Sequence, residues 1–199
     1  MSKDFYTAVK ERRTIYGLSK EPVTSDQRIL EIIEQAVKHA PSAFNSQSGR
    51  AVLLLGEHHH RLWDITKNIL AKIVPPEILE QTIQKLNGFR NGYGSILIFE
   101  DQKVITDLQA NFPTYKDAFP IFSQNSSGML QYILWTSLEV EGFGASLQHY
   151  NPLIDEEVKK EWNLPGHWKL VAEMPFGKPT APAGEKEFQP LAERIKIFQ

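Results

Sequence analysis

The 199-residue sequence contains no cysteine. This absence excludes disulfides, a thiolate nucleophile and cysteine-ligated iron–sulfur clusters. Any redox chemistry must therefore be carried by a bound molecule. No apolar run approaches the roughly 18 residues that a membrane-spanning helix needs. The first residues also lack the apolar stretch of a signal peptide. We therefore expect no membrane partner and a cytoplasmic location.

An excess of one charge is also missing, because 22 Lys and Arg residues face 24 Asp and Glu residues. A net charge of -2 provides no basic field to attract nucleic acid. No Gly-x-Gly-x-x-Gly run follows a strand and opens a helix, so a tightly held dinucleotide of the Rossmann type is not expected. The length and the 41% hydrophobic content fit a single domain spanning residues 1–199.

Hydrophobic periodicity predicts many helices and few strands. Thr24 and Gln27 have the capping-box spacing at the start of a helix that Pro41 ends. The stretch 87–94 is expected to be a loop, and 113–124 is expected to be either a loop or a broken helix. Because strands and helices do not alternate strictly, the fold class is expected to be α+β. Helices are predicted at 4–11, 24–40, 59–72, 75–85, 101–112, 127–141 and 155–162, and strands at 51–55, 96–99, 143–147 and 168–175.

The first functional motif is Arg12-Arg13-Thr14, directly after the first predicted helix. A guanidinium group binds phosphate oxygens as a bidentate fork and stays charged at any working pH. Threonine adds a hydroxyl group. The alternative is a solvated charge cluster at a helix end.

The second motif contains Pro41, Ser42, Asn45 and Gln47. Each carboxamide carries donors and acceptors, which suits the edge of a heterocycle with alternating carbonyls and ring nitrogens. The alternative is plain helix-stop and turn chemistry. Together, the two motifs predict a flat, phosphate-bearing cofactor.

The order and spacing of these motifs resemble the flavin-dependent nitroreductase family. Glu141–Ser146 is similar to its turn after the central helix, and Phe176–Pro179 with Gly184–Lys186 is similar to its C-terminal closing segment. Leu147–Pro152 resembles a compact branch that includes fatty-acid-repression-type nitroreductases. The resemblance covers essentially the whole chain.

This resemblance implies a central, mostly antiparallel sheet flanked by helices, in a homodimer that exchanges its C-terminal strands. It implies FMN at the dimer interface and a ping-pong cycle. NADH or NADPH would give hydride to the flavin, and a small aromatic acceptor, nitroaromatic or quinone-like, would then take the electrons.

The resemblance also assigns roles to residues. Arg12, Arg13 and Thr14 would contact the phosphate and ribityl chain, and Pro41, Ser42, Asn45 and Gln47 the ring. The backbone from Gly144 to Gln148 would approach flavin N5, although Gly142 and Gly144 also fit a helix cap and turn. Lys178 or Lys186 would reach the phosphate. Lys186 is the better candidate, although Glu187 and Phe188 depart from the family pattern after it.

Two further groups of side chains have alternative roles. His149 could donate a proton to the reduced acceptor, or it could be a partly buried histidine bonded to backbone. Aromatic side chains could line a substrate pocket or form ordinary core, and the core role is favoured for Trp135. The pocket candidates are Phe44, Tyr93, Tyr115, Phe119 and Phe122.

His58-His59-His60 is expected to be an exposed turn without a metal, because adjacent residues do not converge on a tetrahedral ion. Two other functions stay open at this point. One is a non-catalytic flavin-binding protein that regulates lipid metabolism or a stress response. The other is a metal-binding stress protein that uses the histidine triplet.

Overall fold

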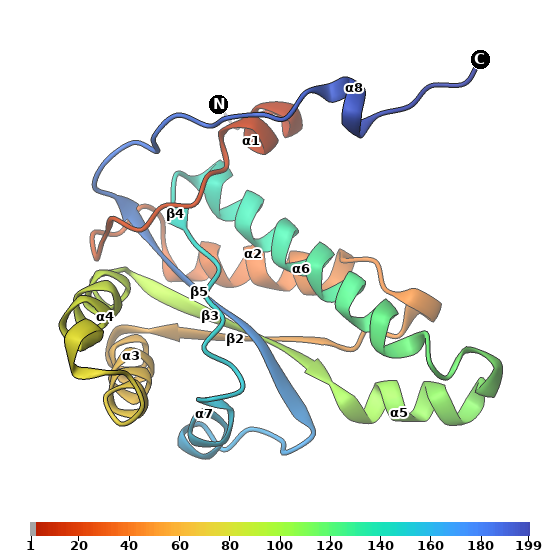
Figure 1. Ribbon diagram of the computed structural model, residues 1–199, viewed down its shortest axis with the longest axis horizontal. Helices are drawn as coiled ribbons and strands as arrows, with labels where there is room; N and C mark the ends of the chain where they lie inside the picture. The colour runs from red at the N-terminus through yellow and green to blue at the C-terminus, as the bar shows by residue number, and fades with distance from the viewer. Residues whose placement is uncertain (1–2) are drawn as a thin grey trace.

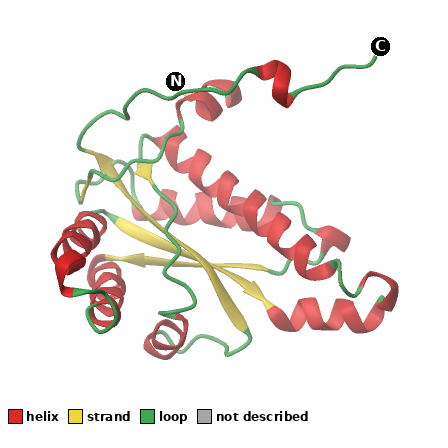
Figure 2. Cartoon of the chain, viewed as in Figure 1, coloured by secondary structure: helices red, strands yellow, loops and turns green. Residues whose placement is uncertain are grey.

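The computed structural model describes residues 3–199, so residues 1 and 2 of the expected domain lie outside it. Its centre is an antiparallel sheet with strand order β1-β5-β3-β2, and β4 pairs with β5 beside this path. Helices cover both faces of the sheet (Figure 2). The α+β class and the antiparallel sheet are therefore confirmed. The strands are β1 (Leu18–Ser19), β2 (Gly49–Leu55), β3 (Gly94–Asp101), β4 (Gly144–Ala145) and β5 (Trp168–Pro179).

The helices form two layers. The pair α2 and α6 lies on one side of the sheet, and α3, α4 and α7 lie on the other (Figure 1). The helices are α1 (Phe5–Glu11), α2 (Asp26–His39), α3 (Gly56–Leu70), α4 (Pro76–Arg90), α5 (Gln102–Asn111), α6 (Phe119–Glu141), α7 (Asp155–Glu161) and α8 (Leu191–Arg194), with short 3-10 helices η1 (Ala43–Asn45) and η2 (Pro113–Tyr115).

Strand β3 joins the two layers, because all eight of its residues are buried. Its side chains alternate between the faces, as the pleat of a strand requires. Ile96 and Ile98 pack in the cluster under α2 and α6, whereas Leu97 and Phe99 pack in the cluster under α3 and α4. This double burial explains why the strand reads as an uninterrupted apolar run.

The start of α2 and the end of α4 differ from the expected ones. Ser25, and not Thr24, caps α2, because its hydroxyl accepts the Arg28 N–H at 3.2 Å. Helix α4 continues to Arg90, so the loop expected from residue 87 is wrong at its start. Burial of Phe89 outweighs the low helix propensity of Asn87-Gly88.

Helix α6 begins at Phe119, eight residues before the expected start at 127. Pro120 is tolerated because the first turn of a helix has no partner for its N–H groups. Buried Phe119, 1% exposed, anchors this turn. The expected strand at 143–147 contracts to β4, Gly144–Ala145.

The C-terminal tail runs away from the body of the chain (Figure 1). Its apolar side chains Phe188, Leu191, Ile195, Ile197 and Phe198 are all exposed. Within residues 3–199, none of the helices combines the length and the apolarity needed to cross a bilayer.

Candidate functional site

The segment after α2 has an unusual backbone. Phe44, Asn45 and Gln47 all have left-handed φ angles of 57°, 51° and 48°. The hydroxyl of Ser42 accepts the Gln47 N–H at 2.9 Å, which closes the loop. Left-handed residues with side chains are disfavoured and gather at functional sites. The loop therefore presents the exposed carboxamides of Asn45 and Gln47 on a fixed backbone.

The arginine motif lies at the end of α1, beside α6. The guanidinium carbon of Arg12 lies 4.3 Å from the centre of the Trp135 ring. The Nε atom of Arg12 is buried and has no hydrogen-bond partner within residues 3–199. Sequence reasoning assigned Trp135 to the core, and it missed this contact because the two residues are far apart in the chain. The stacked ring fixes the plane of the guanidinium group.

The C-terminal closing segment reaches the arginine motif. Nη2 of Arg13 donates to the carbonyl oxygen of Glu185 at 3.3 Å. Lys186 is therefore next to a residue that Arg13 contacts, and its Nζ lies 5.3 Å from the centre of the Phe188 ring. The structure thus brings Arg12, Arg13 and the segment around Lys186 together from opposite ends of the sequence.

These basic groups lack acidic partners. Arg28, Arg50, Arg61 and Arg90 each pair with a carboxylate. In contrast, the part of the chain that the structure describes gives no ion pair to Arg12, Arg13 or Lys186. Two adjacent arginines without carboxylate partners, next to the segment that carries Lys186, are suited to an external anion. This donor set, with the unpartnered Nε of Arg12, fits the phosphate of a mononucleotide.

Lys178 and Tyr93 lie apart from this arrangement. Nζ of Lys178 pairs with Glu21 at 2.5 Å, and this pair lowers the pKa of Glu21. The Tyr93 hydroxyl donates to Asp26, in the first turn of α2, at 2.5 Å. Phe44 follows the other end of that helix, about 20 Å along its axis. The structure therefore does not bring Tyr93 to the other pocket aromatics.

Those other aromatics do gather around Phe44. Its ring centre lies 5.3 Å from that of Phe119 and 5.8 Å from that of Tyr115. Phe112, which the sequence reasoning left out, joins them at 5.0 Å. Phe122 contacts Phe119 at 6.1 Å. Phe44 and Tyr115 are about half exposed and offer aromatic faces to solvent. Phe119 is buried and packs against both of them.

Within one chain, the two motifs lie on opposite flanks of α6. Arg12 contacts Trp135, whereas a narrow crevice lined by Ser42 and Gln47 is bordered by Ser126. Trp135 comes nine positions after Ser126 in α6, which is about two and a half helical turns, so the two side chains face opposite sides of the helix. One chain therefore presents its phosphate-type donors and its carboxamides to different sides.

Gly144 is required by protein packing. A Cβ atom there would lie 2.8 Å from Cγ2 of Ile15, where residues 14 and 15 run beside β4. Ile15 N donates to the Ala145 carbonyl at 3.0 Å. The glycine thus lets the Thr14 segment approach β4 closely.

The segment after β4 is tied to β5. Gln148 is buried, and its backbone exchanges two hydrogen bonds with Glu173, at 2.8 and 3.0 Å. The Gln148 amide donates to Ser146 Oγ at 3.0 Å. His149 is exposed, so its expected alternative role as a partly buried histidine is wrong.

Two buried carboxyl groups were missed by the sequence reasoning. Glu173 is fully buried, and its Oε2 accepts the Tyr150 N–H at 2.9 Å. Burial raises the pKa of Glu173 to about 8. Glu100 accepts the hydroxyls of Ser48 and Ser123 at 2.7 and 2.6 Å, and burial raises its pKa as well. Both lie within buried strands, Glu100 in β3 and Glu173 in β5, where the sequence pattern indicates only the apolar neighbours.

The histidine triplet is not an exposed turn, which corrects that expectation. It lies in the first turns of α3, and His59 is fully buried. His59 contacts Ser95 Oγ at 2.9 Å and the Arg90 carbonyl at 3.2 Å. Across residues 3–199, no group of three or more histidine or acidic side chains is arranged to hold a metal ion.

The comparisons with known proteins agree with one another. The family model described as the nitroreductase family matches residues 9–178. Nitroreductase FRM2 of Saccharomyces cerevisiae is 33% identical over 190 residues, which are 93% of each chain. HBN1 of the same yeast is 38% identical over 94% of this chain and 93% of that protein.

Solved structures give the same result. CinD from Lactococcus lactis, in complex with chloramphenicol, has a TM-score of 0.91 and 43% identity. The match covers 98% of this chain and 100% of that one. A complex of CinD with 4-nitrophenol has a TM-score of 0.87 and 44% identity. The nitroreductase-like fold expected from the sequence is thereby confirmed.

Proposed function

Because the chain belongs to the nitroreductase family, we propose that it is an FMN-dependent oxidoreductase that uses NADH or NADPH to reduce small aromatic acceptors. When bound, FMN would supply the two-electron exchange between the nicotinamide and a nitroaromatic or quinone-like acceptor. The observation that carries this proposal is the set of basic side chains without acidic partners at Arg12, Arg13 and Lys186. FMN-bound structures among the fold neighbours agree with it.

The residues divide the work of holding the cofactor. Arg12, Arg13 and Lys186 would hold the phosphate, and Thr14 would bond the ribityl chain. Asn45 and Gln47 would meet the polar edge of the ring, with Pro41 and Ser42 shaping the loop around them. Lys178 is occupied by Glu21, so we assign the phosphate contact to Lys186.

We propose that Gln148 and His149 lie beside the ring of the cofactor, as the family resemblance implies. The segment that carries them is fixed to β5 by paired backbone hydrogen bonds, which suits a backbone that must approach a ring closely. The exposed imidazole of His149 would pass a proton from solvent to a reduced acceptor, because a histidine side chain can both accept and donate a proton.

The aromatic group around Phe44 would hold the acceptor. Planar rings stack on aromatic faces, and Phe44 and Tyr115 are exposed for such contact. The ligands in these two complexes of CinD, chloramphenicol and 4-nitrophenol, are small nitroaromatic compounds. We propose the same class here. Tyr93 is outside this group because of its contact with Asp26.

We also propose that the active form is a homodimer. The two motifs face opposite flanks of α6 in one chain, so one cofactor would take phosphate contacts from one copy and carboxamide contacts from the other. Strand β2 pairs only with β3 among the described residues, and a groove of about 530 Å³ lies between it and α2. The exposed, alternating Ile195 and Ile197 of a partner's tail suit that open strand edge.

The test is an absorbance spectrum of the purified protein followed by steady-state oxidation of NADH and of NADPH with 4-nitrophenol or a quinone. We expect flavin absorbance, release of FMN on heating, and turnover with an acceptor. A yellow protein without turnover would favour the non-catalytic regulatory role. A colourless protein that does not take up FMN would contradict the proposal.

A further inference from the structure

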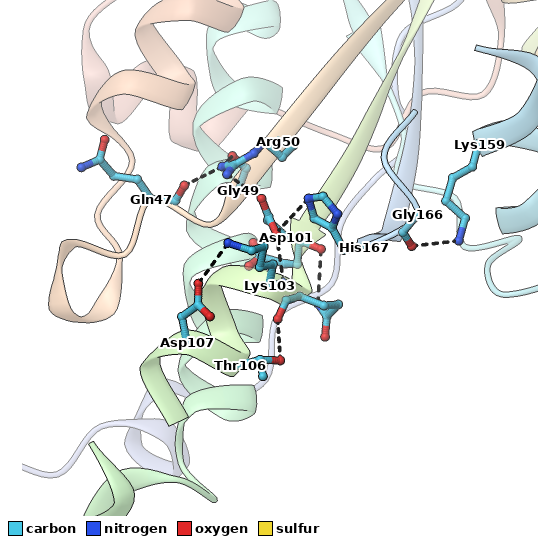
Figure 3. Close-up of polar contacts among 12 residues, drawn as sticks. Gln47, Gly49, Arg50, Asp101, Lys103, Thr106, Asp107, Lys159, Gly166 and His167 are labelled. Atoms are coloured by element: carbon cyan, nitrogen blue, oxygen red, sulfur yellow. Dashed lines mark hydrogen bonds and ion pairs between the residues drawn. The ribbon is translucent and has the colours of Figure 1, made fainter. Parts of the chain in front are cut away.

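The backbone of Gln47 is held by Arg50. Nη1 of Arg50 donates to the carbonyl oxygen of Gln47 at 2.6 Å and to that of Gly49 at 3.0 Å. The Gln47 carboxamide points away from Arg50 (Figure 3). Arg50 therefore restrains the main chain of Gln47 and makes no contact with its carboxamide. That group is exposed, and its Nε2 donates only a long hydrogen bond of 3.5 Å, to the Asn45 carbonyl.

Arg50 is itself fixed by Asp101 at the end of β3. Its Nη2 donates to Asp101 Oδ2 at 2.8 Å, and Asp101 is 6% exposed (Figure 3). The other oxygen of Asp101 accepts the Lys103 N–H at 3.0 Å and lies 3.6 Å from Nε2 of His167. The ring of Trp168 lies 5.8 Å from the Arg50 guanidinium carbon. These contacts orient the guanidinium group of Arg50.

The neighbouring residues of β3 anchor Ser48 in the same way. The Asp101 N–H donates to the Ser48 carbonyl at 2.9 Å. Oε2 of buried Glu100 accepts the Ser48 hydroxyl at 2.7 Å. The end of β3 thus holds Ser48 and Arg50, the residues on either side of Gly49, directly after Gln47.

Such a restraint is needed because Gln47 has a φ angle of 48°. A residue with a side chain keeps this conformation only where its surroundings determine it. Arginine is suited to the task, because its planar fork can bond two carbonyl oxygens and a carboxylate at once. A lysine ammonium is a single point charge and cannot reproduce that geometry.

We propose that Arg50 is a positioning residue, which Asp101 orients, and that it fixes Gln47 so that the carboxamide of Gln47 meets the FMN ring edge. This inference rests on the proposed function, because FMN binding is its premise. It assigns a role in cofactor binding to residues that are placed outside both sequence motifs.

The test compares holoprotein variants by serial dilution, following the rise in FMN fluorescence as the cofactor is released. Arg50→Lys should raise the dissociation constant roughly tenfold, because a charged hydrogen bond to Gln47 is lost. Asp101→Asn should raise it less, since asparagine still caps α5. If Arg50→Lys does not fold, Asp101→Asn provides the same comparison with native protein.

The matched control is Arg61→Lys, because Arg61 pairs with Glu161 at 2.9 Å on α3 and α7, away from the loop. It should leave FMN release within about twofold of native, as expected for an exposed ion pair. Thermal midpoints of all variants are recorded, so that a general loss of stability is separated from a loss of FMN affinity.

A double-mutant cycle with Gln47→Ala decides whether Arg50 acts through Gln47. In the Gln47→Ala background, Arg50→Lys should weaken FMN binding much less than in native protein. Losses that multiply would show an independent structural role and would overturn the inference. Equal FMN affinity of the native and Arg50→Lys proteins would overturn this inference and leave the proposed function standing. A native chain that holds no FMN would overturn the proposed function and this inference together.

Discussion

The guanidinium group of Arg12 stacks 4.3 Å from the centre of the Trp135 ring, and its Nε is buried without a partner among residues 3–199. The stacking holds the group in place without neutralising its charge. Arg12 is therefore prepared for an anion before the anion arrives, which lowers the ordering cost of binding.

Replacement of Arg12 should weaken FMN binding without a large change in stability. Arg12→Ala removes a charged donor, so the dissociation constant should rise at least tenfold, by about 1.5–3 kcal/mol. The Arg12→Ala, Arg13→Ala double variant should be purified without flavin absorbance. Arg61→Ala is the control. A double variant that keeps native flavin content would contradict the phosphate assignment.

The two candidate lysines should behave differently. Lys186→Ala should raise the FMN dissociation constant roughly tenfold, because a charge-assisted contact to phosphate is lost. Lys178→Ala should leave it nearly unchanged, since Lys178 pairs with Glu21. Fluorescence of released FMN measures both. The reverse order of effects would assign the phosphate contact to Lys178.

Glu173 should make the protein less stable as the pH rises. Burial raises its pKa to about 8 in the folded chain, from an ordinary value of 4.5. The folded state therefore binds more protons than the unfolded state between these values, and the free energy of unfolding falls with pH there. The slope reaches about 1.4 kcal/mol per pH unit.

Urea unfolding of native protein and Glu173→Gln across pH 5 to about 8 measures this effect. The glutamine variant cannot ionise, so its stability should depend less on pH in that window. Parallel curves for the two proteins would show that Glu173 is ionised in the folded state at neutral pH.

His59 should have the opposite effect. Burial lowers its pKa from 6.5 to about 4 in the folded chain. The Arg90 carbonyl can only accept, so Nε2 carries the proton and Nδ1 accepts from the Ser95 hydroxyl. The unfolded state binds more protons between pH 4 and 6.5, so stability is lost as the pH falls through this range.

A histidine NMR titration checks this directly. We expect the His59 ring to stay neutral at about pH 5.5, because burial lowers its pKa to about 4. A His59 resonance that titrates at an ordinary value would contradict the buried, neutral state.

Much of the fold follows from local patterns. The helical stripe of α2 and the apolar run of β3 identify both elements, because each must bury a specific face. The start of α6 was not predictable, since Pro113 and Pro120 read as helix breakers while burial of Phe119 decided the outcome.

The site was predictable where its residues are adjacent in sequence. Arg12 to Thr14 and Ser42 to Gln47 are short motifs whose charged and hydrogen-bonding groups can be recognised in the sequence. Contacts between positions far apart in the sequence were not predictable, because no local pattern indicates them. Trp135 under Arg12 and Asp101 beside Arg50 are examples. The separation of Tyr93 from the other aromatics of the same chain was not predictable for the same reason, since only the folded chain shows its bond to Asp26.

The central claim is that one FMN is held by two copies of the chain, and complementation tests it most directly. One variant carries Arg12→Ala and Arg13→Ala, and the other carries Asn45→Ala and Gln47→Ala. Neither should hold FMN alone. In a mixed dimer, one site would receive both defects and the other would be fully native.

The decisive measurement is the FMN content of dimers formed by co-expressing the two variants in equal amounts. We predict recovery of about a quarter of the native flavin content, from one intact site in each mixed dimer of a symmetric assembly. Mixed dimers as empty of flavin as the parent variants would contradict the account. That result would show that both motifs of one FMN site come from the same chain.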